Sequence, residues 1–148
     1  MSYTPQVPSC LALILADNIH VCPSTQKRTI LGTFTAVFAE QFPTPLNVAV
    51  YCCLTDAIGK IRVDVKFVRV NSDEFSDELV AEAHGDIDFP DPLAMIEMNM
   101  FFQGLQLTHA GEYRFQVWVA DEVLLERRLV VISVQNEENS DPEENLNE

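Results

Sequence analysis

Apolar and polar residues alternate with a period of two along most of this chain. In residues 60–67 (KIRVDVKF) every second residue is apolar, and the residues between them are charged. Residues 94–102 and 112–119 repeat this alternation. Successive side chains of a strand point to opposite faces of its sheet, so the pattern is typical of antiparallel strands with one buried face. The chain is therefore predicted to be built from strands.

Turn-forming residues divide the chain between these apolar runs. Residues 56–59 (DAIG), for example, are expected to close a hairpin. The predicted strands cover approximately residues 10–21, 28–38, 46–55, 60–67, 78–84, 93–103, 112–119 and 123–134. About eight strands with short turns favour an all-β fold, a single antiparallel β-sandwich.

The two ends of the chain differ in composition from this body. Residues 1–9 contain two prolines and no Lys or Arg, and are expected to form an N-terminal extension. Residues 135–148 contain six acids, no base, no aromatic residue and one Leu. Such a segment buries too little apolar area to offset the entropy of ordering it. The sequence predicts one β-sandwich domain over 10–134 and a disordered acidic tail over 135–148.

The charge balance excludes some partners. The 148 residues include 23 acidic and 9 basic side chains, a formal net charge of −14. Nucleic acid is an unfavourable partner because phosphate binding relies on Lys and Arg, and anionic membrane surfaces are disfavoured for the same reason. No apolar run is long enough for a membrane helix, and the N-terminus lacks the features of a secretory signal. We therefore expect a cytoplasmic protein.

The four cysteines, Cys10, Cys22, Cys52 and Cys53, do not have the spacing of a zinc site. Buried free thiols are the expectation for a reducing compartment. A bridge between Cys10 and Cys22, or between Cys22 and Cys52, is the alternative if the protein is exported.

The approach to the strand at 112–119 resembles a corner of immunoglobulin-like domains. Leu105, Ala110, Gly111 and Tyr113 fit its pattern of a Leu, a turn ending in a small residue and Gly, and then a Tyr. In such domains the Tyr hydroxyl bonds back to the backbone of the corner. Phe115 stands where many of these domains have their second core cysteine. The resemblance implies an immunoglobulin-like sandwich in which Gly111 and Tyr113 have a structural role.

The body of the chain, residues 10–134, also resembles a family of small uncharacterised bacterial proteins. Its recurring segments are 15–17 (LAD), 30–34 (ILGTF), 41–43 (QFP), 89–92 (FPDP) and 111–115 (GEYRF). This resemblance implies a compact β-sandwich. It implies neither an activity nor any catalytic residues.

Acidic residues concentrate between positions 73 and 91. Eight acids and no Lys or Arg lie in this segment, which is expected to form loops at one end of the sandwich. Asp86, Asp88 and Asp91 are close in sequence, and calcium takes six to eight oxygen ligands. They are the candidate metal site, for calcium. The alternative is that the carboxylates form turn hydrogen bonds beside the prolines.

A catalytic site has weak support in the sequence. Asp17, His20 and Cys22 lie within six residues of one another. On a strand, however, His20 and Cys22 share one face and Asp17 points to the other, so the three side chains do not converge. We expect a protein that is not an enzyme; a hydrolase using Cys22 and His20, or the loop carboxylates, is the alternative.

The candidate partner surface includes Trp118, Arg114 and Gln116, which face outward if Tyr113 and Phe115 face the core. Phe101 is a second aromatic residue that is out of phase with its strand. Exposed Trp and Arg are typical anchors of protein interfaces. The alternative is that Trp118 packs beneath a neighbouring loop.

These observations predict a non-catalytic module that binds another protein or forms a homo-oligomer. The rival interpretation is a module that binds calcium or carbohydrate through the loops between 73 and 91, with Trp118 as a possible sugar-stacking face. No cofactor is expected apart from calcium in that rival interpretation.

Overall fold

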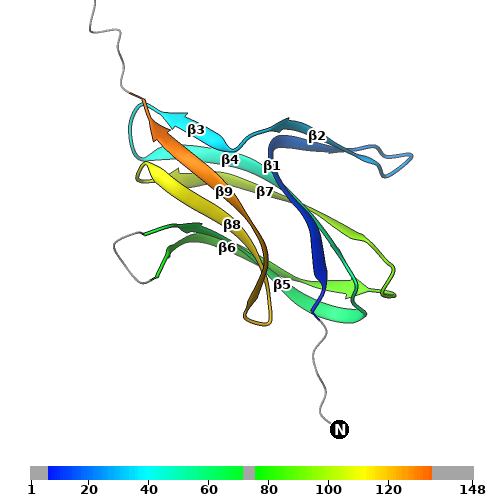
Figure 1. The fold of residues 1–148 in the computed structure, drawn as a ribbon. Coiled ribbons are helices and arrows are strands. Elements are labelled where there is room, and N and C mark those ends of the chain that lie inside the picture. Colours follow the sequence, from blue (N-terminus) through cyan, green and yellow to red (C-terminus); the bar gives the residue numbers. More distant parts are fainter. Residues whose placement is uncertain (1–6, 72–75, 135–148) are drawn as a thin grey trace, which may run out of the picture.

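The computed structural model describes residues 7–71 and 76–134, which form nine strands and no helix (Figure 1). No segment of these two ranges is a helix that could cross a membrane. The strands are β1 (Ser9–Val21), β2 (Arg28–Thr33), β3 (Ala36–Ala39), β4 (Thr44–Thr55), β5 (Gly59–Arg69), β6 (Glu78–Phe89), β7 (Ile96–Leu107), β8 (Gly111–Val119) and β9 (Glu122–Ser133). The all-β prediction is confirmed, while the predicted disordered tail, 135–148, lies outside the described residues.

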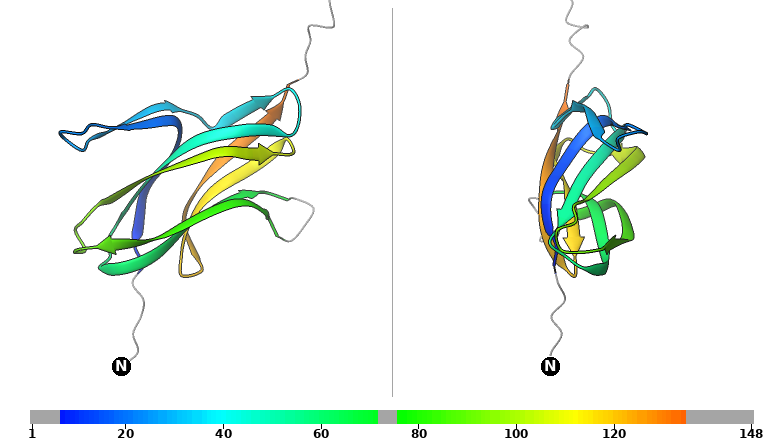
Figure 2. Two further views of the ribbon diagram at one scale, coloured as in Figure 1. Left: turned by 180° about the vertical axis from the view of Figure 1, so that it is seen from behind. Right: turned by 90° about the vertical axis from the view of Figure 1, so that its right-hand side faces the viewer.

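The strands form two sheets that pack face to face (Figure 2). One sheet has the order β2-β1-β4-β7 and the other the order β3-β9-β8-β5-β6. Every ladder is antiparallel except that of β3 with β9, which is parallel. Each sheet has one apolar face because its residues alternate, and the two apolar faces bury one another.

Three aromatic side chains form the centre of the core. The Phe67 ring on β5 stacks on Phe115 and on Tyr113 of β8, with centroid distances of 4.4 and 5.3 Å. Phe102 on β7 contacts Phe115 from the opposite sheet at 5.5 Å. Phe67, Tyr113 and Phe115 have no exposed surface. Each aromatic ring of this size contributes about 1.5–3 kcal/mol when it is fully buried.

The predicted strand over residues 28–38 is wrong in its extent, because it is two strands in different sheets. β2 ends at Thr33 and β3 begins at Ala36. Gly32 has a φ of 71°, and a Cβ on it would clash with the carboxylate of Asp17. The chain crosses to the other sheet between Thr33 and Ala36, which explains nine strands instead of eight.

The acidic segment is also different from the prediction, because most of it is a strand and not a loop. β6 continues to Phe89 and pairs with β5 along its whole length. The alternation of Asp86 and Asp88 with Ile87 and Phe89 extends the strand by five residues beyond its predicted end at residue 84. Asp73 and Glu74, at the start of the acidic segment, lie outside the described residues.

Tyr113 makes the hydrogen bonds that a tyrosine corner requires. Its hydroxyl donates to the carbonyl oxygen of His109 at 2.8 Å and accepts from the His109 N–H at 3.3 Å. Gly111, between the two residues, has a φ of 133°, in a region that favours glycine. These bonds fix the turn through which the chain passes from β7 in one sheet to β8 in the other.

Substitution of Tyr113 by Phe removes both corner bonds and keeps the stacked ring. We expect the free energy of unfolding to fall by about 1 kcal/mol, the net contribution of a partly buried hydrogen bond. Denaturant unfolding of Tyr113→Phe measures this change. The control is Phe101→Leu, at an exposed position, which is expected to change stability by less than about 0.5 kcal/mol. Equal stability of Tyr113→Phe and the wild type would contradict a stabilising role for the corner.

Candidate functional site

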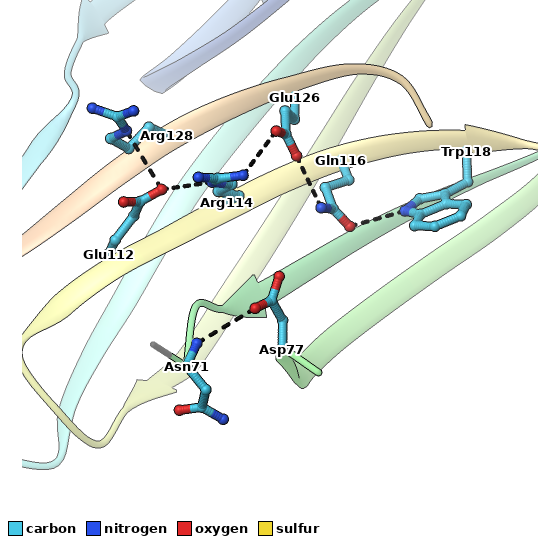
Figure 3. Close-up of polar contacts among 8 residues, drawn as sticks. All are labelled: Asn71, Asp77, Glu112, Arg114, Gln116, Trp118, Glu126 and Arg128. Atoms are coloured by element: carbon cyan, nitrogen blue, oxygen red, sulfur yellow. Dashed lines mark hydrogen bonds and ion pairs between the residues drawn. The ribbon is translucent and has the colours of Figure 1, made fainter. Parts of the chain in front are cut away.

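A chain of polar contacts crosses the outer face of the five-stranded sheet (Figure 3). Arg114 on β8 lies at its centre. Its Nε donates to Glu112 Oε2 at 2.6 Å, and its Nη1 donates to Glu126 Oε1 on β9 at 2.9 Å. Arg128 Nε lies 3.5 Å from Glu112 Oε2. Charges of opposite sign therefore alternate along this face, and they hold the Arg114 guanidinium in one orientation.

The same chain continues to the single tryptophan. Gln116 Nε2 donates to Glu126 Oε2 at 2.9 Å, and Trp118 Nε1 donates to Gln116 Oε1 at 3.0 Å. Gln116 is only 8% exposed, so its amide depends on these two partners. Arg114, Gln116 and Trp118 share this face because they alternate with the buried residues of β8. The contacts fix the orientation of the indole ring (Figure 3).

Lys66 on β5 completes the surroundings of the indole. Its Nζ lies 4.4 Å from the centroid of the Trp118 ring, within the range of a cation–π interaction. Beside the ring is a shallow hollow of about 280 Å³. Its lining residues are Lys66, Val68, Asp77, Leu79, Gln116 and Trp118. Leu79 is 50% exposed there, so the hollow offers apolar surface next to the indole and an ammonium group.

The hydrogen bond to Glu112 is the main cause of a raised pKa of Arg114. This carboxylate favours the charged form of the guanidinium. Arg114 is therefore cationic at neutral pH, as arginine side chains in proteins are.

The structure brings together three of the four residues expected at a partner surface. Arg114, Gln116 and Trp118 are neighbours on the outer face of the five-stranded sheet. Phe101 does not join them, because β7 belongs to the other sheet and Phe101 points away from the core with 56% of its surface exposed. The sequence pattern missed Glu126 and Lys66, although the register of the β8–β9 hairpin places Glu126 directly opposite Gln116.

A second polar cluster lies on the outer face of the four-stranded sheet, the face of Phe101. Arg28 on β2 donates from Nε to Asn99 Oδ1 at 3.0 Å and from Nη1 to Glu97 Oε1 at 2.9 Å. The Tyr51 hydroxyl donates to the other oxygen of Glu97. Partial burial and Glu97 raise the pKa of Tyr51, so its hydroxyl stays protonated. Arg28 thereby links the first strand of this sheet to the last one.

The three carboxylates of the candidate calcium site do not form one cluster. Asp86 and Asp88 stand on β6, where their register partners on β5 are Arg62 and Lys60. Asp91 Oδ1 accepts a hydrogen bond from the Leu93 N–H at 2.8 Å, which is a turn contact. Within residues 7–71 and 76–134, no group of three or more acidic, His or Cys side chains could hold a metal ion. Calcium binding stays a prediction that calorimetric titration tests.

All four cysteines are free thiols, and the bridges considered for Cys22 are not present. Cys10 and Cys52 lie closest to one another, with Sγ atoms 3.8 Å apart. Cys22 Sγ lies 3.4 Å from Ser24 Oγ, and no hydrogen bond joins it to His20 among the described residues. These contacts do not assemble the Cys22–His20 pair that a hydrolase would require.

Another histidine contacts a hydroxyl. His109 Nδ1 lies 2.8 Å from Thr108 Oγ1, and both side chains are exposed in the corner turn. In the described part of the chain no carboxylate bonds to this ring, so the pair lacks the third group that orients a catalytic base.

Comparisons with known proteins complete this description. A family model described as "Family of unknown function (DUF6941)" matches residues 11–132. The match confirms the resemblance to an uncharacterised family. A search of curated proteins found no match.

Solved structures of three β-glucosidases are similar to this chain in part. The Listeria innocua enzyme in complex with gluconolactone is 11% identical, with 90% of this chain and 17% of that chain covered and a TM-score of 0.46. The Kluyveromyces marxianus enzyme is 18% identical, with 67% and 15% covered and a TM-score of 0.43. β-Glucosidase 3B from Thermotoga neapolitana is 12% identical, with 82% and 16% covered and a TM-score of 0.45. This chain thus spans less than a fifth of each.

Cys22 is expected to react with alkylating agents faster than the other cysteines. Hydrogen bonds from Ser24 and Thr25 lower its pKa to about 6, so it is a thiolate at neutral pH. The contact with Cys10, and then burial, raise the pKa of Cys52, which is expected to stay unreactive. Mass spectrometry after iodoacetamide treatment should show alkylation of Cys22 increasing with pH around a midpoint near 6. Cys22→Ser is the control, and a midpoint near the ordinary thiol value of about 8.5 would contradict the expectation.

Proposed function

Because the chain belongs to DUF6941, a family of unknown function, we propose its role from the site itself. The protein is a non-catalytic module that binds a protein partner through the outer face of the five-stranded sheet. We call this surface the Trp118 face and define it by Trp118, Gln116, Arg114 and Lys66.

The observation that carries the proposal is the fixed orientation of an accessible Trp and Arg. Trp118 donates to Gln116 and lies under the ammonium group of Lys66, while Arg114 is held by two carboxylates. Ordering a flexible side chain at an interface costs about 0.5–1.5 kcal/mol of binding free energy. Trp118 and Arg114 are already ordered before a partner binds, so this cost is reduced. Preorganised Trp and Arg are the residues that contribute most to binding energy at protein interfaces.

The hollow beside the indole supports a protein as the partner. Val68 and Leu79 give it an apolar wall, and its volume of about 280 Å³ accommodates an aliphatic or aromatic side chain of a partner. Lys66 and Asp77 also line it, so it has charged groups of both signs at its edge. An apolar hollow within a polar rim is the usual arrangement at such interfaces.

We also propose that the sandwich is immunoglobulin-like. Two features support this assignment. The first is the bond of the Tyr113 hydroxyl to His109, which is the corner contact of these domains. The second is the presence of two packed sheets with strands that are almost all antiparallel.

Substitution of Trp118 by Ala is expected to weaken partner binding by about 30-fold, which corresponds to about 2 kcal/mol for a central interface residue. Immobilised wild-type protein is used to capture partners from a native lysate, and each captured protein is then titrated against the variants. Sedimentation velocity over a range of concentrations tests whether a second copy of the chain is the partner.

Phe101→Ala is the matched control, since it removes an exposed aromatic ring from the opposite sheet. A partner of the Trp118 face should bind Phe101→Ala as tightly as wild type and should lose affinity for Trp118→Ala and Arg114→Ala. Binding or self-association that is equal in wild type and Trp118→Ala would overturn the proposal.

A further inference from the structure

The sandwich is open along the side where β6 and β7 run. Among the described strands, these are the last ones of their sheets, and each is hydrogen-bonded to a neighbouring strand on one side only. Both are visible along the molecule in the left-hand view of Figure 2. A groove of about 330 Å³ lies between them, lined by residues that include Val63, Val65, Gly85, Ile87, Met98 and Met100.

The floor of this groove belongs to the hydrophobic core. Val63 and Val65 on β5 are each 2% exposed, so the groove reaches the central layer of the sandwich. Met98 and Met100 on β7 form the opposite wall and are partly buried. Methionine is flexible and polarizable, which suits a wall that must fit the side chains of a partner.

Gly85, in the middle of β6, has no structural reason to be glycine within this chain. Its backbone is outside the left-handed region, and a Cβ on it would meet no atom within 4 Å. Glycine weakens a strand because it loses the most conformational freedom on folding. A glycine inside a strand often marks the close approach of another backbone, and here the space beside it is open.

The outer face of β6 carries three carboxylates that form no ion pair with any residue the structure describes. Glu82, Asp86 and Asp88 are exposed, and their register neighbours on β5 are Lys66, Arg62 and Lys60. Two of these cations bind elsewhere, however. Lys66 lies over Trp118, and Arg62 donates to Asp64 at 3.1 and 3.3 Å. No ion pair joins the three carboxylates to a side chain within the described residues, so they attract an external cation.

Between residues 81 and 89, the edge of β6 also lacks the devices by which proteins block a free strand. The irregularity in its ladder with β5 lies before this range, where Val80 has no register partner. Its inward-facing residues Ala83, Gly85 and Ile87 carry no charge, and residues 78–89 contain no proline. Inward-facing charges and prolines are the usual protection against the addition of another strand. The backbone groups on this side of β6 are therefore accessible to an extended chain.

We propose that β6 binds an extended segment of another protein, which adds a sixth strand to the five-stranded sheet. The segment alternates apolar and basic residues. Its apolar side chains enter the groove over Gly85 and contact Met98 and Met100. Its Lys or Arg side chains lie on the outer face, beside Glu82, Asp86 and Asp88.

β5 shows that β6 accepts a strand of this kind. Residues 60–67 pair with the other side of β6, and their apolar side chains face the core while Lys60, Arg62 and Lys66 face outward. The chain's own segment 135–148 is a poor occupant, because it contains six acids and no base. Charge complementarity therefore points to a basic partner segment and not to this acidic one.

A synthetic peptide of eight residues that alternates Lys and Val, labelled with a fluorophore, tests the proposal. Fluorescence anisotropy with the full chain should show saturable binding. The control peptide has the same composition in two blocks, so it has the same charge and hydrophobicity without the alternation. We expect binding of the alternating peptide to be at least tenfold tighter, and equal binding of the two peptides would overturn the proposal.

Two variants locate the binding site. Gly85→Phe fills the groove without a clash at Cβ and is expected to weaken binding at least tenfold, with an unchanged or higher melting temperature. If this variant does not fold, Asp86→Lys/Asp88→Lys reverses the charge at two exposed positions and is expected to produce a similar loss. Phe101→Ala is the control, because it removes an exposed ring from the outer face of the other sheet, and it is expected to bind the peptide like wild type.

Hydrogen exchange distinguishes strand addition from a purely electrostatic contact. Addition of the peptide should slow exchange of the amides between residues 82 and 88 on β6, because new backbone bonds form there. Unchanged exchange in this segment at saturating peptide, or full binding by the variant that replaces Gly85, would show that the peptide does not occupy the groove.

Discussion

The stack of Phe67 on Tyr113 and Phe115 fixes the faces of two neighbouring strands. Because the rings of β5 and β8 point into the core together, the residues between them must point outward together. Lys66, Arg114, Gln116 and Trp118 acquire their common surface in this way. A shift of register by one residue would exchange the two sets, placing an indole and a guanidinium in the core. The burial of three aromatic rings therefore determines the Trp118 face as much as its own polar contacts do.

The two sheets differ in their number of strands, and the second surface of the protein lies where their last strands, β6 and β7, run. Five strands pack on four, and β6 and β7 leave the core accessible between them. In most sandwiches a side of this kind is covered or protected by charges that point inward. Here the inward residues are small or apolar, three of the outward residues are acidic, and the central inward residue is a glycine with unfilled space around it. Backbone groups, apolar contacts and charge all favour the same kind of occupant, an extended segment with alternating apolar and basic residues. The two surfaces lie on the same sheet but use different chemistry.

The structure shows where the acidic residues between 73 and 91 lie, which the composition does not. Between residues 73 and 91 the sequence suggested loops that could surround a cation. Most of these residues are instead part of β6, where alternation separates the carboxylates from the core and lines them up along an edge. Asp91 alone, of the three proposed ligands, lies in a turn, and it bonds to the backbone of Leu93. Carboxylates arranged in a row along a strand suit a row of basic side chains better than a single ion.

By itself, the sequence determined that the chain is built from strands, which face of most of them is buried, and the corner at Tyr113, because the period of two acts locally and a tyrosine corner spans five residues. It also indicated that Arg114, Gln116 and Trp118 share a face, since they alternate on one strand. Only the tertiary structure decided which strands share a sheet. Phe101 and Trp118 both point away from the core, yet they lie on opposite faces of the sandwich, because alternation relates a residue to its own strand and not to other strands. The same reason explains why residues 28–38 divide between the two sheets and why the groove beside Gly85 could not be predicted: both depend on contacts between segments far apart in the chain.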